Sequence, residues 1–353
     1  MAKVFFTKDL EKLDRLIDKS ELMKAIGKGD EVALKIHFGE PGNKAFVKPQ
    51  YARIVADKVK RAKGRPFLTD SNVLYHGQRD YTVKHLMVAH NHGFTVEATG
   101  APVIIADGIH SRDYVKVEID KKHFKEVYIG SAGYYADSMI AITHFKGHEV
   151  TGFGGAIKNI GMGLGSRAGK QQMHADVKPE VNEKKCTNCN VCVDNCPVNA
   201  ISPSKDAIHR VSINLDKCIG CAECIVMCRF DAIAIQWSEA TDLIQEKIAE
   251  YALGAAKNKA DKIAYINFLT DISPNCDCYP FNDKPIAPNI GILASFDAVA
   301  IDQASYDLVN KVEGRIDGPD KFRTLYPTVD STIQLKHAEE IGLGSREYEL
   351  VSL

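Results

Sequence analysis

Eight of the ten cysteines lie in two short runs, and this clustering constrains the fold more than any other feature of the chain. The runs, CTNCNVCVDNC (186–196) and CIGCAECIVMC (218–228), share the spacing C-x2-C-x2-C-x3-C. Matching positions are 32 residues apart (186 to 218), and Ala-Ile follows each run at the same distance, which indicates a duplicated small module. Three thiolates spaced in this way can surround one iron-sulfur cluster. Structural zinc, which favours two separate C-x2-C pairs, is the weaker alternative.

The segment from about residue 183 to residue 237 resembles the bacterial two-[4Fe-4S] ferredoxin. Arg229 stands where that family has a second proline. The resemblance implies two [4Fe-4S] clusters as cofactors, one held by Cys186, Cys189, Cys192 and Cys228, and one by Cys218, Cys221, Cys224 and Cys196. We therefore expect metal binding and one-electron transfer.

Charge and hydropathy argue against nucleic acid and membranes as partners. The chain has 45 Lys and Arg against 46 Asp and Glu, so no field of one sign would attract a polyanion. The N-terminal MAKVFFTKDLEKLD becomes charged after a few apolar residues, and no apolar run reaches membrane-spanning length. We expect a cytoplasmic protein, since a reducing compartment keeps thiols available for metals.

Strand and helix patterns alternate on both sides of the cysteine runs. Short apolar runs predict strands at 32–38, 65–70, 102–107, 139–145, 262–269 and 289–295. Helical patterns cover 49–64, 240–258 and 297–312, with Pro49 at a first helical position and Asp297 as a possible N-cap. These patterns predict an α/β domain of residues 1–180 and 239–353, with a mostly parallel sheet and flanking helices. A small α+β dicluster ferredoxin domain, residues 181–238, would be inserted after a polar linker at 175–185. Two separate α/β domains are the alternative.

A second candidate site lies in the glycine-rich stretch 143–174, directly after a predicted strand. Glycines at this density leave backbone N–H groups free to bind anionic oxygens, and Gly152, Gly154 and Gly155 are the candidates. Lys158 would anchor the anion. Acid-base candidates are His144, His148 and His37, the last of which follows the first long strand. The alternative is a flexible loop with solvated cations and structural histidines.

The remaining cysteines, Cys276 and Cys278, lie in SPNCDCYPF after another predicted strand. A C-x-C pair is too close for an unstrained disulfide, but two thiolates on one loop can share an extra metal ion. Free, partly buried thiols are the alternative.

Several segments together resemble the iron-sulfur centre proteins of domain-of-unknown-function family 362. They are KIHFGEPGN, HFKGHEVTGFGGAIKNIGMG, the cysteine runs, NCDCYPF and NIGILASFDAVAID. The resemblance spans nearly the full length and implies an α/β domain carrying a dicluster ferredoxin, without an assigned activity. A fainter likeness to nickel-pincer lactate racemases covers His148, the turn 152–155 and Lys158, although residues 37–40 differ from the Thr-Arg-Pro of those enzymes.

These observations lead to a main hypothesis and two alternatives. The main hypothesis is an iron-sulfur oxidoreductase whose two [4Fe-4S] clusters relay electrons between a redox partner protein and a small anionic substrate on the α/β domain. The first alternative is a non-catalytic electron carrier that docks a partner protein. The second is an isomerase or metal-cofactor enzyme in which the clusters are structural.

Overall fold

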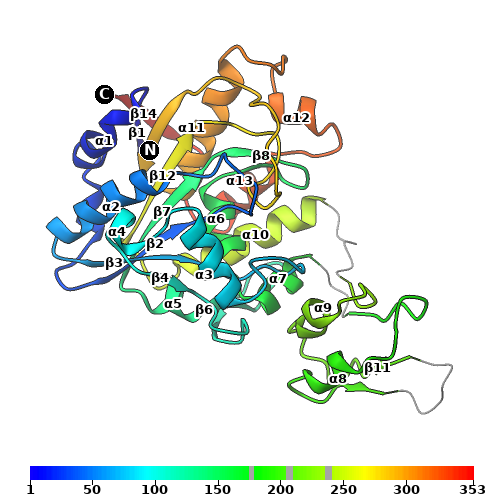
Figure 1. Ribbon diagram of the computed structural model, residues 1–353. Helices are drawn as coiled ribbons and strands as arrows, with labels where there is room; N and C mark the ends of the chain where they lie inside the picture. Colours follow the sequence, from blue (N-terminus) through cyan, green and yellow to red (C-terminus); the bar gives the residue numbers. More distant parts are fainter. Residues whose placement is uncertain (175–178, 204–209, 235–240) are drawn as a thin grey trace.

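An eight-stranded sheet forms the centre of the protein in a computed structural model, which describes residues 1–174, 179–203, 210–234 and 241–353 (Figure 1). The strand order is β14-β1-β13-β12-β7-β2-β3-β4. Strands β12, β7, β2, β3 and β4 run parallel to their neighbours in this group, β14 runs parallel to β1, and β13 is antiparallel to both β12 and β1. The strands are Ala2–Thr7 (β1), Glu31–Ile36 (β2), Arg65–Asp70 (β3), Val103–Ile105 (β4), Ser138–His144 (β7), Ile263–Leu269 (β12), Gly291–Ser295 (β13) and Tyr348–Ser352 (β14).

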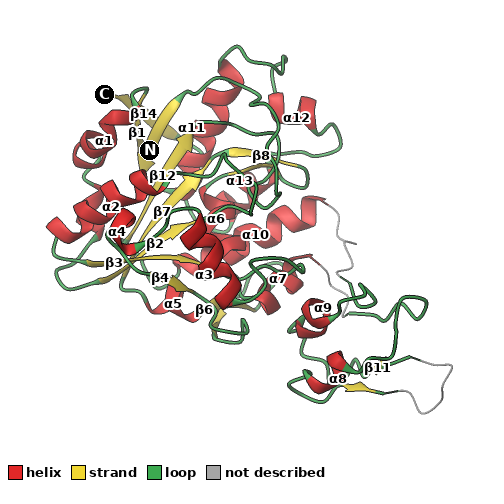
Figure 2. Cartoon of the chain, viewed as in Figure 1, coloured by secondary structure: helices red, strands yellow, loops and turns green. Residues whose placement is uncertain are grey.

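Helices cover both faces of this sheet (Figure 2). Along β7, Met139 and Ala141 enter one hydrophobic core, whereas Ile140 and Ile142 enter the other, because successive strand residues point to opposite faces. The core that contains Ile140 is covered by Leu13–Lys19 (α1), Pro49–Arg61 (α2) and Thr82–Asn91 (α3). The opposite core is covered by Ala156–Leu164 (α6), Thr241–Ala256 (α10), Ala298–Lys311 (α11) and Ile333–Glu340 (α13).

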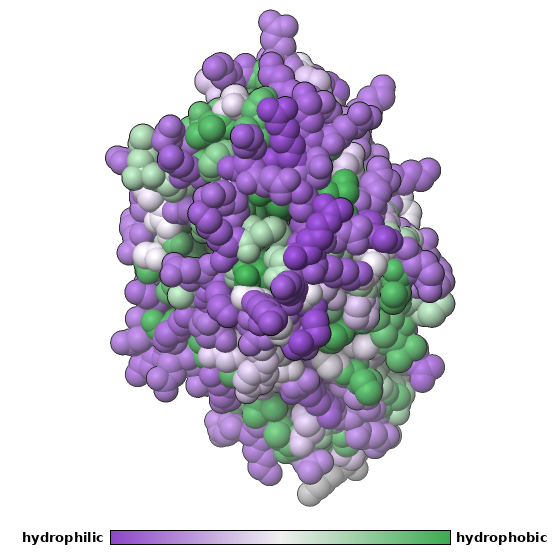
Figure 3. All heavy atoms as spheres, turned by 90° about the vertical axis from the view of Figure 1, so that its left-hand side faces the viewer, coloured by the Kyte–Doolittle hydropathy of each residue, from purple (hydrophilic) through white to green (hydrophobic). Residues whose placement is uncertain are grey.

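Smaller elements complete the body around the sheet. The two short hairpins are Tyr114–Glu118 with Glu126–Gly130 (β5, β6), and Lys146–His148 with Gly152–Gly154 (β8, β9). The short helices are Leu10–Lys12 (η1), Leu22–Ala25 (η2), Val96–Thr99 (α4), Ser131–Tyr135 (α5), Arg167–His174 (α7) and Lys321–Leu325 (α12). The face shown in Figure 3 is mostly hydrophilic, with apolar groups in small patches.

The α/β architecture with a mostly parallel sheet is confirmed. Each of the predicted strands overlaps an observed strand, and α2, α10 and α11 begin within one residue of their expected positions. The caps follow the sequence signals: Pro49 starts α2, and the Asp297 carboxylate accepts the N–H groups of Val299 and Ala300 at the start of α11. The strands β1 and β14 were not predicted.

The described residues between 179 and 234 form a small lobe beside the body, which we call the cysteine lobe (Figure 1). It contains Val191–Asp194 (α8), Ile201–Ser202 (β10), Ser212–Ile213 (β11) and Glu223–Met227 (α9). In the chain it follows α7 and precedes α10, as the predicted insertion requires. The predicted boundary at 238/239 and the start of the predicted linker lie outside the described residues.

The two halves of the cysteine lobe repeat each other at the level of the backbone. Asn190 and Ala222, which are 32 positions apart, both adopt left-handed φ values, of 58° and 59°. The N–H groups of Ala200 and Ala232 each donate to a cysteine sulfur, Cys196 Sγ and Cys228 Sγ, over 3.2 Å in both cases. The duplication expected from the sequence is therefore present in the folded chain.

Candidate functional site

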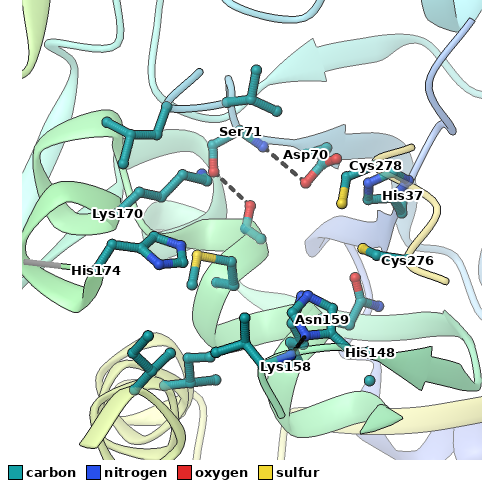
Figure 4. Close-up of a pocket in the computed structure, with 18 of the residues that line it drawn as sticks. His37, Asp70, Ser71, His148, Lys158, Asn159, Lys170, His174, Cys276 and Cys278 are labelled. Carbon is teal, nitrogen blue, oxygen red and sulfur yellow. Dashed lines mark hydrogen bonds between the residues drawn. The ribbon is translucent and has the colours of Figure 1, made fainter. Parts of the chain in front are cut away.

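A cavity of about 160 Å³ lies beyond the carboxyl ends of β2, β3, β7 and β12 (Figure 4). In sheets of this kind, ligands bind at these strand ends. The cavity brings together several residues singled out in the sequence, namely His37, His148, Gly154, Gly155, Lys158, Cys276 and Cys278. They come from three separate chain segments, which follow β2, β7 and β12 of the parallel part of the sheet.

Cations outnumber acids around the cavity. The charged lining residues are Asp70 and Glu149 against Lys35, Arg79, Lys146, Lys158 and Lys170. Asp70 is already paired: its Oδ1 lies 3.0 Å from Lys35 Nζ, and its Oδ2 lies 3.8 Å from Arg79 Nη1. Although burial opposes ionisation of Asp70, the charge of Lys35 and its neighbours holds the pKa of this carboxyl well below its ordinary value. The lining therefore carries more cations than acids, although Arg79 and Lys146 pair with Glu40 and Asp277 just outside it.

Lys158 is the cation best placed to meet a ligand. Lys35 and Lys146 form ion pairs with Asp70 and Asp277, at 3.0 and 3.3 Å. Lys158 forms no ion pair with any residue that the structure describes, and its side chain lines the cavity beside His148. A lysine with an unmatched charge in a partly enclosed site favours an anionic ligand.

The thiols of Cys276 and Cys278 face the same cavity (Figure 4). A hydrogen bond with Cys278, together with the charges of Lys158 and His148, holds the pKa of the Cys276 thiol well below its ordinary value in spite of burial. The same hydrogen bond and burial raise the pKa of Cys278. Within the pair, the negative charge is therefore favoured on Cys276 rather than on Cys278.

His144 does not line the cavity, so the structure gives this acid-base candidate a positioning role instead. Its Nδ1 lies 2.9 Å from both carboxylate oxygens of Asp277, and its Nε2 lies 2.8 Å from the Thr270 carbonyl oxygen. Both ring nitrogens are thus occupied, and the imidazole holds the side chain of Asp277, the residue between the two cysteines, in place. His37 does line the cavity, and burial lowers its pKa to about 3, so that it is neutral at physiological pH.

The candidate anion loop is only partly in the cavity. Gly152 and Gly154 belong to β9 and pair with β8, and Gly152, at φ 73°, packs against Ser331 rather than facing the cavity. The two N–H groups that follow the candidate glycines, those of Ala156 and Ile157, donate to the Asp302 carboxylate over 2.7 and 2.9 Å. Gly154 and Gly155 line the cavity, and anion binding by their N–H groups stays a prediction.

Sequence reasoning missed Lys35, Arg79, Lys170 and His174, which all line the cavity. A lysine in the middle of the apolar strand β2 was a usable signal, because an ionised residue is rarely fully buried without a partner. Arg79 lies in a loop, and Lys170 and His174 lie on α7. The neighbouring sequence gives no signal that distinguishes these residues from solvent-exposed ones.

Lys170 makes anion binding sensitive to pH. Burial lowers the pKa of Lys170 to about 8, so the ammonium group loses its charge as pH rises through this value. We expect the affinity for a small dianion such as oxalate to fall about tenfold above this pH. Calorimetric titrations on both sides of the transition measure this change. The step should disappear in Lys170→Met and persist in a surface variant, Lys24→Met; an unchanged step in Lys170→Met would contradict the assignment.

The cysteine lobe contains two smaller cavities, and each is lined by four cysteines. Cys186, Cys189, Cys192 and Cys228 line one, and Cys196, Cys218, Cys221 and Cys224 line the other. In each set, three cysteines come from one run and the fourth comes from the other run. The structure thus groups the thiols in the same sets as the ferredoxin resemblance, while binding of clusters by them stays a prediction.

The cysteine lobe packs directly against the wall of the central cavity. Leu74 lines the cavity and also belongs to the hydrophobic cluster of the lobe, which includes Cys192 and Ile225. Nearby, Arg167 Nη1 donates to Glu223 Oε2 over 2.9 Å, and both side chains are buried. The Tyr81 hydroxyl donates to Glu223 Oε1 over 3.0 Å. A continuous packed contact therefore joins the lobe to the cavity.

One set of three potential metal ligands has all its ligand atoms within 4.8 Å of one another in the described part of the chain, namely His123, Glu250 and His337. The Glu250 carboxylate already accepts the N–H groups of His123 and Phe124, and lies 3.1 Å from His337 Nε2. This arrangement accounts for the buried carboxylate without a cation. Cys276 and Cys278 belong to no such set, so an extra metal on these thiols stays a prediction.

These features define an α/β protein with a cation-rich cavity at the carboxyl ends of its parallel strands and a cysteine-rich lobe between α7 and α10. The chain belongs to the family described as domain of unknown function DUF362, whose profile matches residues 32–307.

Two solved structures share part of this architecture. The lactate racemase apoprotein from Thermoanaerobacterium thermosaccharolyticum is 14% identical with a TM-score of 0.39, over 77% of this chain and 51% of that chain. A structural-genomics protein from Thermotoga maritima is 11% identical with a TM-score of 0.40, over 86% and 59%. The chain thus spans little more than half the length of these structures. No curated protein matches the chain. None of the helices in the described residues has the length and apolar character needed to cross a membrane.

Proposed function

We propose that the protein is an iron-sulfur oxidoreductase, in which two [4Fe-4S] clusters of the cysteine lobe relay electrons to or from a small anion bound in the central cavity. The observation that carries this proposal is the packed contact between lobe and cavity. Leu74 belongs to both, and the buried Arg167–Glu223 pair fastens the lobe to α7, which itself contributes Lys170 to the cavity.

The residues of the lobe fit the proposed clusters. Each cavity offers four thiols, the number of ligands that a [4Fe-4S] cluster requires. Burial raises the pKa of Cys192 to about 11, and burial also raises the pKa of Cys221. Thiols in such surroundings are poor nucleophiles but become thiolates when iron binds. When bound, the clusters would supply one-electron chemistry, while the chain positions them next to the cavity.

The cavity supports the second half of the proposal, an anionic reaction partner. Lys158 is unpaired within the described residues, and Lys170 retains its charge below pH of about 8. Both line the cavity that holds the thiols of Cys276 and Cys278, with Lys170 on the side opposite the sulfurs. A small molecule with a carboxylate would be held by these cations with its reacting atoms close to the sulfurs.

Lys158→Ala tests the proposal. Anaerobically purified protein should contain about eight irons and eight sulfides per chain, in the wild type and in the variant. After reduction by dithionite and its removal, reoxidation by a panel of small carboxylates and organic anions is followed by visible absorbance. We expect a compound that reoxidises the wild type to act at least about tenfold more slowly on Lys158→Ala. The surface variant Lys24→Ala should behave as the wild type.

The alternatives give different results in the same experiment. A non-catalytic carrier would hold about eight irons but react with no small anion, and Lys158→Ala would change nothing. A metal-cofactor enzyme would retain nickel, zinc or another metal besides iron, which metal analysis of the same samples detects. A chain without iron and sulfide would refute the proposal.

A further inference from the structure

We propose that Cys276 and Cys278 form a redox-active dithiol that reduces a small anionic disulfide in the central cavity, with Cys276 as the attacking residue. The inference rests on the proposed function, because the electrons that regenerate the dithiol would arrive through the iron-sulfur clusters. Two one-electron carriers match the two electrons that a dithiol–disulfide couple exchanges.

The backbone brings the two cysteines into one turn. The Tyr279 N–H donates to the Cys276 carbonyl oxygen over 3.1 Å, which closes a turn over residues 276–279. A closed turn keeps its Cα atoms within about 7 Å, close to the range of roughly 4.4–6.8 Å that disulfides span. A disulfide across one residue is strained, and strained disulfides are more easily reduced, as a catalytic pair requires.

The surroundings of Cys276 suit a nucleophile. The residue is 4% exposed, but its sulfur faces the cavity, where Lys158 and His148 also lie (Figure 4). Its hydrogen bond with Cys278 favours a thiolate at position 276 and a thiol at position 278, as the opposite pKa shifts of the pair show. Attack by one thiolate and resolution by a neighbouring thiol is the order of events in dithiol exchange.

The charges of the cavity select an anionic substrate. Lys158 can hold a carboxylate near the sulfurs, and Lys170 adds a second cation on the opposite side of the cavity. Glu149, the acid that is not paired with a buried cation, instead accepts a hydrogen bond from the Tyr279 hydroxyl over 3.1 Å. A cationic disulfide would therefore meet Glu149 as a single acid against the cations Lys158 and Lys170, so repulsion would dominate.

Reduction of the substrate disulfide balances with these two residues, and a reduced redox partner protein is the one-electron donor that regenerates them. Cys276 thiolate attacks the substrate disulfide, whose S–S bond breaks to release one thiolate and leave a mixed disulfide. The Cys278 proton passes to that thiolate, and Cys278 sulfur then attacks Cys276 Sγ and releases the second half of the substrate as a thiolate. Two electrons, delivered singly through the lobe, and one proton then restore the starting thiolate and thiol.

A charge-matched pair of small disulfides tests this inference in the full-length, anaerobically purified protein. The dianion 3,3′-dithiodipropionate and the dication cystamine are added separately, and samples are acid-quenched, alkylated and digested with trypsin. The tryptic peptide that begins at Ile263 contains Cys276 and Cys278 and no other cysteine, so it reports this pair alone. We expect the dianion to oxidise the pair at least about tenfold faster than the dication. Lys158→Ala should remove this preference, and Cys278→Ser should trap mercaptopropionate on Cys276.

The inference would be overturned if neither disulfide oxidised the pair, or if both oxidised it at equal rates. It would also be overturned if Cys276→Ser trapped an adduct on Cys278 while Cys278→Ser trapped none on Cys276. Thiols that react only after a chelator removes a metal would contradict it as well. The readout is separate from that of the proposed function. A chain with normal iron content and an inert thiol pair would refute the dithiol alone. A chain whose thiol pair reacts but which lacks iron and sulfide would refute the relay alone.

Discussion

Replacing Arg79 by methionine is expected to lower the free energy of unfolding by about 3–5 kcal/mol. Arg79 is only 1% exposed and donates to Glu40 Oε2 and to the Tyr75 hydroxyl, both over 2.8 Å. Methionine fills much of the same volume but leaves the buried Glu40 carboxylate without its cation. The cost arises from that unpaired charge more than from the lost contact. Urea unfolding of the two proteins measures the difference.

Two further variants separate the charge effect from a general loss of packing. Arg53→Met removes a half-exposed arginine that pairs with Asp57 on the surface of α2, and should cost less than about 1 kcal/mol. Adding Glu40→Gln to Arg79→Met removes the unpaired carboxylate charge and should recover part of the lost free energy of unfolding. Two results would show that the Arg79–Glu40 ion pair does not stabilise this side of the cavity. In the first, Arg79→Met lowers the free energy of unfolding by less than about 1 kcal/mol; in the second, the double variant recovers none of the loss.

Replacing Cys196 by alanine is expected to reduce iron from about eight to about four atoms per chain. The iron should be lost from the other run, because Cys196 lines the cavity of Cys218, Cys221 and Cys224. Alkylation followed by peptide mapping should therefore find these three thiols newly reactive, while Cys186, Cys189 and Cys192 stay protected. Cys228→Ala should give the reverse pattern. Reactivity of the run that carries the substitution would instead mean that each run binds its metal alone.

Local patterns were enough to predict most of the sheet. Buried strands such as β7 and β12 are continuous apolar runs, and turn residues mark their ends. The direction of β13 could not be predicted, because hydrophobicity does not distinguish a parallel from an antiparallel neighbour. The edge strand β14 was missed because it is partly exposed and follows no alternating pattern.

The cysteine sets and the cavity residues differ in how far the sequence reveals them. The cysteines can be recognised from their spacing in the sequence. Their grouping into two sets of four depends only on a duplicated local fold. The cavity depends on tertiary structure: Arg79 reaches Glu40 across 39 positions, and His144 reaches Asp277 across 133. The hydrogen bond that Asp302 accepts from the Ala156 N–H, 146 positions away, could not be predicted for the same reason.

The place of the cysteine lobe in the chain also bears on how the protein is synthesised. Strand β7 ends at His144, but its partner β12 begins only at Ile263, after the whole lobe. Contacts between distant segments form slowly, and during translation the N-terminal part of a chain emerges first. The lobe therefore leaves the ribosome while the central sheet is still open. Its thiols therefore become accessible before the body closes beside them, so loading of the proposed clusters can precede completion of the fold.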